Sequence, residues 1–325
     1  MTQDLAYSNS YLTQQTQLYI RNASIRRVKS TGKLGISYNT IRCYQLFYKI
    51  IEQFEVYHGS KINLEKVEKS ELDSFTNWLI NIKKYSINNA GQQIKILKTI
   101  ATEAEKNGLT IKPHLKYISS FSKHSNDRHI HTLSFEEIDR IKALAVKDEI
   151  LENARKWLLI GVSIGQRVSD LLKLKPSQIR AANNGGLYID IIQKKTTQLV
   201  TIGVIDPFVI NILQKNFPNP MSEPLFNKYI KKVCKLANIT ETVKGYKFNK
   251  ESKRKELNFY PKNELICSHD LRRSFATNYF GKIPTPILME ITGHKKESTF
   301  QIYIGVTQNK DSIADAFMEQ LKKLV

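Results

Sequence analysis

The sequence is poor in cysteine and contains no long apolar segment. Its 325 residues include three cysteines, Cys43, Cys234 and Cys267, and none of them is at CxxC spacing. Such thiols suit a reducing compartment, and we expect them to be buried and unpaired. No apolar run approaches the roughly 20 residues that a membrane span needs, and the N-terminus has no signal-like apolar core. We therefore expect a soluble protein of the cytoplasm with no membrane partner.

Acidic residues are scarce relative to basic ones. The chain has 50 Lys+Arg against 30 Asp+Glu, a formal net charge of +20, and a pI near 9.7. This excess favours a polyanionic partner, and DNA, RNA and an acidic membrane surface all qualify on charge alone. Residues 1–125 hold 18 basic and 9 acidic residues, and the rest of the chain holds 32 and 21. Because the excess is divided between both parts, each is able to face phosphate groups.

The first third of the chain predicts a helical domain. A chain of 325 residues is long enough for two domains, and 41% hydrophobic with 25% charged residues is a globular composition. Apolar residues recur at three- and four-residue spacing over 41–54, 72–82 and 94–104, and a weaker pattern covers 9–22. We expect a helical N-terminal domain over 1–115, followed by a linker over 116–131 that has no clean period.

Residues 132–325 predict a second domain of mixed α+β structure. Ser134 and Glu137 fit a capping box at the start of a helix. Alternating apolar residues predict strands over 187–192 and 199–204, joined as a hairpin through Lys194 to Thr197. The stretch 244–262 is basic and loop-like. Further helices are expected at 134–146, 149–164, 168–174, 206–216, 223–237, 269–280, 285–292 and 309–324. The fold class is therefore mainly α with a small β component.

Three stretches concentrate residues that suit phosphate chemistry. They contain Arg167 and Asp170, then His269 and Arg272, then Gly293-His294 with Tyr303 nine residues later. Residues three apart share a helix face, so His269 and Arg272 converge. A guanidinium does not bind metals, but it offers a planar fork to phosphate, and a histidine can move a proton near neutral pH. Each stretch is weak alone, whereas all three in this order, in a basic chain, favour a phosphate-directed site.

Together the stretches resemble the tyrosine recombinase, or phage integrase, family over about residues 132–305. The helical first third is similar in pattern to the core-binding (SAM-like) domain of that family. The matching positions are Arg167 in the first arginine motif with Asp170 at its acidic position, Lys195 as the hairpin lysine, His269 and Arg272 as the HxxR pair, His294 at the later His/Trp position, and Tyr303 as the nucleophile.

The resemblance implies a site-specific DNA recombinase or integrase. Such an enzyme cleaves and rejoins strands through a 3′-phosphotyrosyl intermediate, here on Tyr303, and needs no ATP, metal or other cofactor. The two arginines would neutralise the charge that develops on phosphorus. Lys195 would protonate the leaving 5′-oxygen. The two histidines would assist proton movement and hold the phosphate, and Asp170 would orient its neighbours.

The resemblance also implies partners. Double-stranded DNA is the expected substrate, and the active form is expected to be a homo-oligomer, a tetramer on two DNA sites. The helix at 309–324 would then dock on a neighbouring protomer. An accessory directionality factor and a location on the nucleoid are further expectations of this kind.

Three assignments stay open. Lys194 adjoins Lys195 and could replace it, although Thr196 follows Lys195 as in hairpins of the family. Thr292 stands where members of the family often have leucine, which bears on packing. The stretch 244–262 is either an added DNA-contacting loop or a solvated insertion.

Other functions compete with this interpretation. Gly161-Val-Ser163-Ile-Gly165 fits the G-x-S-x-G elbow of a serine hydrolase, but the residues before it read as a helix and not as the strand that an elbow requires. The small residues would instead let the Arg167 segment pack closely. A non-catalytic DNA-binding protein of the same fold and a type IB topoisomerase are nearer alternatives, and both predict affinity for DNA.

Overall fold

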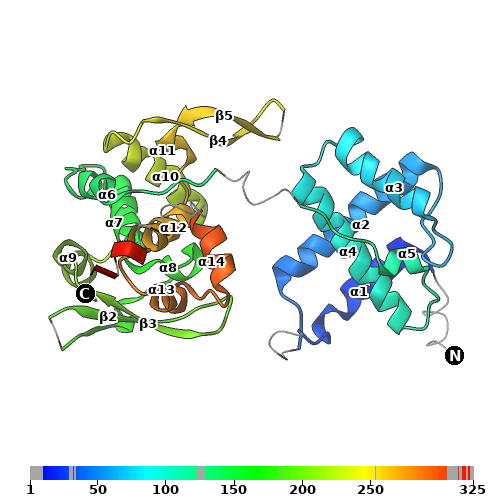
Figure 1. Ribbon diagram of the computed structural model, residues 1–325, viewed down its shortest axis with the longest axis horizontal. Helices are drawn as coiled ribbons and strands as arrows, with labels where there is room; N and C mark the ends of the chain where they lie inside the picture. Colours follow the sequence, from blue (N-terminus) through cyan, green and yellow to red (C-terminus); the bar gives the residue numbers. More distant parts are fainter. Residues whose placement is uncertain are drawn as a thin grey trace. The chain divides into compact units, whose positions relative to one another are not determined.

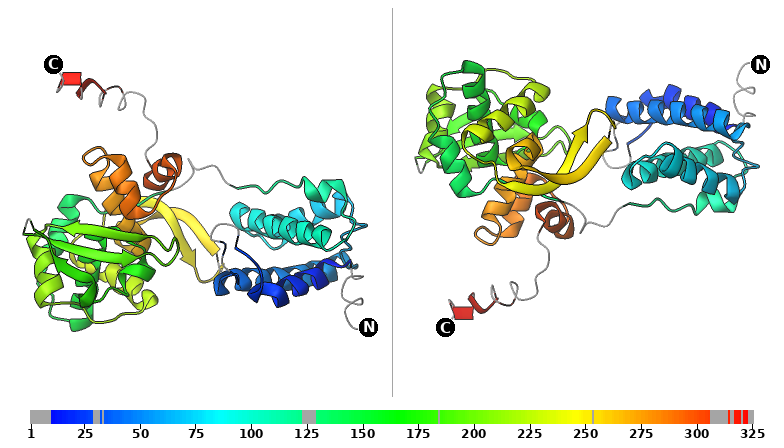
Figure 2. Two further views of the ribbon diagram at one scale, coloured as in Figure 1. Left: turned by 90° about the horizontal axis from the view of Figure 1, so that it is seen from below. Right: turned by 90° about the horizontal axis from the view of Figure 1, so that it is seen from above.

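The computed structural model describes residues 10–28, 32, 34–122, 129–183, 185–252, 254–305, 314, 317–319, 321 and 322. The chain divides into two compact units, Met1–His124 and Ser125–Val325 (Figures 1 and 2). No helix within the described ranges is both long and apolar enough to cross a membrane.

The first unit is a helical bundle, as its apolar periodicity predicted. Its aromatic centre is Phe54, whose ring lies 4.9 Å from that of Phe75 and 5.4 Å from that of Trp78. Gly59 ends the longest helix with φ 80°, a left-handed conformation that glycine adopts without strain. The elements are α1 (Leu12–Arg21), the 3₁₀ turn Asn22–Ser24, α2 (Tyr38–His58), α3 (Lys69–Asn77), the π-helical turn Trp78–Ile82, α4 (Ile87–Lys106) and α5 (Pro113–Lys116).

Helix α5 and the residues that follow it pack on the core of the first unit. Leu115 is fully buried, and Ile118 and Phe121 lie against the same core. The backbone of Phe121 passes so close to Gly91 that any side chain at residue 91 would collide with it. Part of the stretch expected to be a linker, up to Phe121, is thus packed against α4.

The second unit is built around α7 (Glu149–Ile164). This helix packs against α10 (Glu223–Leu236) and α12 (Ser268–Tyr279), and the main core surrounds it (Figure 1). The other helices are α6 (Phe135–Lys142), α8 (Val168–Leu171), the 3₁₀ turn Pro176–Gln178, α9 (Pro207–Lys215), α11 (Lys262–Leu265), α13 (Thr285–Thr292) and α14 (Glu297–Ile304).

Two antiparallel sheets complete this unit. β1 (Ile179–Ala181), β2 (Leu187–Ile192) and β3 (Leu199–Val204) form one sheet in that order, and the strands β2 and β3 have the predicted bounds. Alternate residues of β2 and β3 enter the core, which is why their pattern was readable. β4 (Thr242–Asn249) and β5 (Arg254–Pro261) form the second sheet.

The structure corrects several expectations. The stretch 244–262 is not a loop, because it contains most of the β-hairpin formed by β4 and β5, both faces of which are largely exposed. The apolar alternation at Tyr246 and Phe248 and at Leu257 and Phe259 lies among many basic residues and was not interpreted as strands. Strand β1 and helix α14 were not predicted, and α8 ends at Leu171, three residues early. The expected helix at 309–324 lies mostly outside the described residues, of which 314, 317–319, 321 and 322 are helical.

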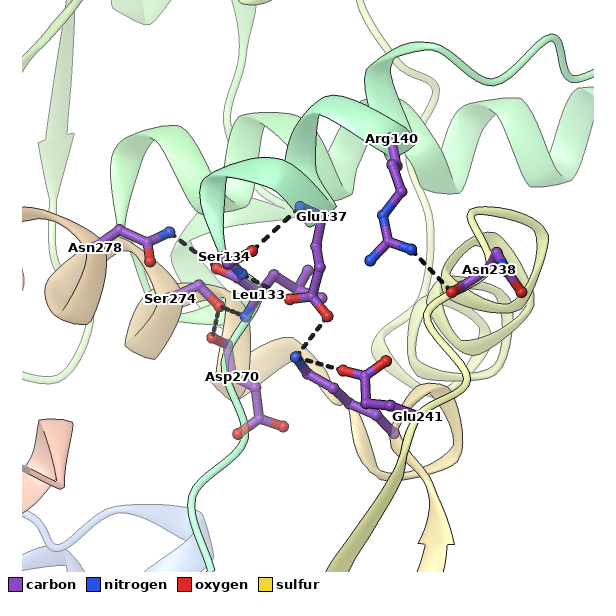
Figure 3. A network of polar contacts seen from close by, with 10 residues as sticks. Leu133, Ser134, Glu137, Arg140, Asn238, Glu241, Asp270, Ser274 and Asn278 are labelled. Carbon is purple, nitrogen blue, oxygen red and sulfur yellow. Dashed lines mark hydrogen bonds and ion pairs between the residues drawn. The ribbon is translucent and has the colours of Figure 1, made fainter.

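A polar network ties α12 to the start of this unit (Figure 3). The Ser274 hydroxyl accepts from the Leu133 amide at 2.8 Å and donates to the Asp270 carbonyl at 2.7 Å. Nearby, Lys262 pairs with Glu137 at 2.6 Å. The predicted capping box at Ser134 and Glu137 is present. Because these contacts are largely shielded from water, they fix the helix that carries His269 and Arg272.

Candidate active site

Small residues let α7 and α12 approach closely. Gly165 ends α7 with φ 61°, and a side chain there would collide with the ring of Phe275. A Cβ atom at Gly161 would lie 2.9 Å from Leu171 and 3.0 Å from Leu271. Ser163 lies inside the helix and donates to the Leu159 carbonyl at 2.8 Å. The G-x-S-x-G motif is therefore a packing feature of a continuous helix and not a nucleophile elbow.

Arg272 occupies the centre of the site. Its side chain is 1% exposed, and its Nη1 donates to the Gly165 carbonyl at 3.1 Å. Its Nη2 is buried and has no hydrogen-bond partner among the described residues. Burial, followed by the like charge of Arg167, lowers the pKa of Arg272 to about 10. The guanidinium thus stays charged at neutral pH and keeps one donor for an anion.

Two glutamines that the sequence reasoning missed hold Arg167 in place. Arg167 Nη1 donates to Gln193 Oε1 at 3.2 Å. The Gln193 amide in turn donates to Gln166 Oε1 at 2.9 Å and to the Ile291 carbonyl at 3.1 Å, and it is completely buried. Gly293 makes room for it, because a side chain at residue 293 would collide with the Gln193 amide. Only their positions beside Arg167 and the hairpin lysines could have drawn attention to these two residues.

Tyr303, on α14, lies among the expected histidines. Its ring centroid is 5.2 Å from that of His269 and 4.8 Å from that of His294. The Arg273 guanidinium lies over the same ring at 5.2 Å, a contact the sequence did not suggest. The Tyr303 hydroxyl is buried without a hydrogen-bond partner among the described residues. The structure thus brings His269, His294 and Tyr303 together.

The positive charges of the site disfavour protonation of its two histidines. Burial and then the arginines Arg273, Arg272 and Arg167 lower the pKa of His269. Burial and then Arg272, Arg167 and other cations lower the pKa of His294 to about 4. Both imidazoles are therefore neutral at pH 7, and a bound anion would be strongly favoured there.

The tyrosine itself is protonated in the free protein. Burial raises the pKa of Tyr303 to about 12, while Arg272 and Arg273 act in the opposite direction. The phenol therefore needs a proton acceptor before it can become a phenolate.

Asp170 connects this site to the β2–β3 hairpin. Its Oδ1 accepts from the Lys194 backbone amide at 3.1 Å, and its Oδ2 is buried without a partner in the described ranges. Lys195 is exposed at the tip of the hairpin, and its charge is one of those that lower the pKa of His294. The lysine side chain is thus close enough to act electrostatically on the site but is not held in it.

The donors of the site are suited to an anion. Guanidinium, phenol and imidazole groups converge there, and three of their polar atoms, Arg272 Nη2, Arg273 Nε and Tyr303 Oη, are buried without partners among the described residues. Within the same ranges, no group of three or more His, Cys, Asp and Glu side chains could hold a metal ion.

Comparison with known proteins identifies similar chains. The model of the phage integrase family matches residues 131–310, and that of the phage integrase SAM-like domain matches residues 19–123. No curated protein matches the sequence.

Three solved structures illustrate the similarity of fold. XerH site-specific recombinase bound to palindromic difH substrate is 15% identical, with a TM-score of 0.63 and 95% of both chains covered. The Tn1549 transposon integrase in complex with transposon right end DNA is 15% identical, with a TM-score of 0.65, covering 96% of this chain and 99% of the other. A lambda integrase tetramer bound to a Holliday junction is 18% identical, with a TM-score of 0.60, covering 89% of this chain and 78% of the other. At these identities the comparison establishes the fold.

Proposed function

This chain belongs to the phage integrase family of tyrosine recombinases, and on that premise we propose that it cuts and rejoins DNA strands with Tyr303 as nucleophile. The observation that carries the proposal is that Arg272 Nη2 and Tyr303 Oη are both buried in the site without a well-formed hydrogen bond among the described residues, while the two groups lie close enough to shift each other's pKa. A charged donor and a nucleophile left open in one site match the two needs of phosphoryl transfer, which are charge neutralisation and attack.

The arginines would neutralise the phosphate. A phosphodiester is already anionic, and attack adds charge to its non-bridging oxygens. Arg272 and Arg167 would bind those oxygens through charge-assisted hydrogen bonds. Arg272 is fixed by the Gly165 carbonyl and Arg167 by Gln193, so neither side chain has to be reorganised when charge develops.

Two proton movements would accompany the transfer. As the bond from Tyr303 Oη to phosphorus forms, the phenolic proton passes to a neutral histidine of the site, His269 or His294. As the bond from phosphorus to the 5′-oxygen breaks, that oxygen takes a proton from Lys195. The product is a 3′-phosphotyrosyl link and a free 5′-hydroxyl. Attack by a 5′-hydroxyl from another strand reverses the step, which requires no ATP.

We propose double-stranded DNA as the substrate and a tetramer on two DNA sites as the active assembly. The net charge of +20 supports phosphate contacts, and their contribution should fall steeply with salt. The solved relatives support the assembly by analogy, since one of them is a tetramer bound to a Holliday junction. An accessory directionality factor and action on the nucleoid in the cytoplasm complete this proposal.

Covalent adduct formation tests the reaction class. Wild type and Tyr303→Phe would be incubated with DNA from the flanks of the protein's own gene, in the presence of a metal chelator, and run on a denaturing gel. We expect a protease-sensitive shifted DNA band with wild type and none with Tyr303→Phe. Tyr279→Phe is the matched control, because Tyr279 is also half-buried in this unit, against Phe275, and should leave the band unchanged.

The alternative functions predict other results. Salt-sensitive binding of both proteins without an adduct, over a broad library of DNA sites, would favour a non-catalytic DNA-binding protein. An adduct accompanied by relaxation of supercoiled plasmid, without exchange between two DNA sites, would favour a topoisomerase.

A further inference from the structure

The turn after α13 brings His294 back onto its own helix. Gly293 adopts φ 62°, a left-handed conformation, at the C-terminal end of α13. The amide of His294 then donates to the Met289 carbonyl at 2.9 Å, which caps the helix. As a result, His294 Nδ1 lies 2.8 Å from the hydroxyl of Thr292. Thr292 is fully buried, so this hydroxyl has no water to bond with.

The direction of this hydrogen bond can be decided. Thr292 Oγ1 lies 2.5 Å from the carbonyl oxygen of Leu288. Two oxygens at that separation need a proton between them, and a carbonyl has none to give. The hydroxyl therefore donates its one proton to Leu288 and can only accept from the imidazole. It follows that His294 carries a proton on Nδ1.

We infer that Thr292 is a positioning residue that fixes the tautomer of His294, with the proton on Nδ1 and an open lone pair on Nε2. The inference rests on the proposed strand-transfer function for its significance, since it assigns how one group of that site handles protons. It gives Thr292 a role beyond packing, at a position where a leucine side chain could not make this contact.

The chemical consequence concerns what His294 can do when neutral. Groups around its ring are Arg167, Lys195, His269, Arg272 and Tyr303, and burial together with the positive charges among them keeps the ring neutral at pH 7. A neutral ring with the proton on Nδ1 can accept a proton at Nε2. It cannot donate to a phosphate oxygen until it has taken up a second proton. His294 is thereby prepared as an acceptor for the proton that Tyr303 must lose.

Nitrogen NMR of the full-length protein tests the tautomer without DNA. The chain would be labelled with ¹⁵N in its histidines, and His294→Gln would assign the resonances. Wild type at neutral pH should show a protonated Nδ1 and an unprotonated Nε2. Thr292→Ser keeps the hydroxyl and should retain this pattern. Thr292→Val has similar volume but no hydroxyl, and its tautomer ratio should move toward the Nε2 proton by about 2- to 10-fold, the effect of one hydrogen bond.

Two results would overturn the inference. A proton on Nε2 in wild type, or an unchanged ratio in Thr292→Val whose thermal unfolding shows that it is folded, would remove the assigned role of Thr292.

The adduct assay provides a second, separable readout. Thr292→Val should form the covalent adduct about 10-fold more slowly than wild type, with an altered pH profile, while Thr292→Ser keeps the wild-type rate. An equal rate for Thr292→Val despite a changed tautomer would show that the tautomer has no part in the reaction. Absence of any adduct from wild type would instead count against the proposed function and leave the NMR result standing.

Discussion

The two β-hairpins of the second unit are both basic, yet they are held in different ways. In β2–β3, one face enters the core, and the tip that follows is anchored through the buried Gln193 and the Lys194 amide. In β4–β5, Gly245 is the one buried residue of the two strands. Contacts of its side chains with the rest of the unit include the Lys247–Glu264 pair at 2.5 Å and the rings of Tyr246 and His129, whose centroids lie 6.0 Å apart.

The exposed hairpin presents an unusual face. Phe248 and Phe259 are 56% and 63% exposed, and Tyr246 and Leu257 lie on the same face between them. Lys244 and Lys255 lie opposite Phe259 and Phe248 in the pairing register. The contrast teaches that a hairpin with one buried face and an anchored tip can hold a lysine close to the candidate site, whereas a hairpin with both faces exposed is suited to contact a partner surface.

The largest effect that separates the hairpins is expected at Lys195. Lys195→Ala should slow cleavage about 10²- to 10⁴-fold, because the leaving 5′-oxygen then lacks its acid. Lys194→Ala is the matched control and should have little effect, since Lys194 contacts Asp170 through its backbone amide. Single-turnover adduct formation measures both.

A substrate with sulfur at the bridging 5′ position sharpens this prediction. A thiolate leaves without a proton, since a thiol pKa is about 8.5. The Lys195→Ala defect should therefore vanish on that DNA. A defect that persists, or a larger loss in Lys194→Ala, would reverse the assignment of the two lysines.

A smaller loss of cleavage rate is expected when Gln193, which anchors the tip of the β2–β3 hairpin, is replaced. Gln193→Leu removes the acceptor that holds Arg167 and the hydrogen bond to the Ile291 carbonyl, and misplacing the guanidinium by about 1 Å should cost on the order of 10²-fold in rate. Gln198→Leu, at the other end of the tip, is the control, because Gln198 contacts the exposed Glu290. Equal rates for the two variants would mean that the tip needs no anchor.

The exposed hairpin should affect binding and not chemistry. Lys244→Ala with Lys255→Ala should weaken DNA binding and reduce the slope of log K against log salt by about 0.9 for each phosphate that the protein no longer neutralises. The cleavage rate at saturating DNA should stay unchanged. An unaltered slope would identify this hairpin as a solvated insertion, and a slower cleavage rate would contradict the functional division between the hairpins.

The smallest effect concerns stability in acid. The pKa of His294 is about 4 in the folded chain and 6.5 when unperturbed, so the unfolded chain binds the extra proton between these values. Stability should thus be complete above pH 6.5 and fall toward pH 4, by at most about 1.4 kcal/mol per pH unit from this group. His294→Gln should unfold in denaturant with a shallower pH dependence over that window. The same slope in both proteins would argue against a neutral, shielded His294.

The difference between the hairpins also explains what the sequence could predict. Strands β2 and β3 could be found because their core residues alternate with more exposed ones. These core residues include Ile189 and Ile191 in β2, and Val200 and Ile202 in β3. Strands β4 and β5 bury no face, and their alternation is limited to Tyr246 and Phe248 in one strand and Leu257 and Phe259 in the other. The many basic residues around these four led to the prediction of a loop.

Some residues of the candidate site could likewise be predicted from the sequence, and others could not. His269 and Arg272 could be placed together because a helix brings residues three apart onto one face. The roles of Gln193 and Thr292 could not be found, because they depend on which atoms these residues meet after folding. The contacts of Gln193 and Thr292 depend on turns and on a hairpin tip, where the backbone follows neither the helix period nor the strand period.

The polarity of the protein–DNA link tests the central claim most directly. A duplex would be labelled at the 5′ end or the 3′ end of the cleaved strand, reacted, digested with protease, and the linked peptide sequenced. The account predicts that the 5′-labelled fragment is retained through its 3′-phosphate on the peptide containing Tyr303, while the 3′-labelled fragment is released with a free 5′-hydroxyl. Retention of the 3′-labelled fragment, or attachment to another residue, would contradict it.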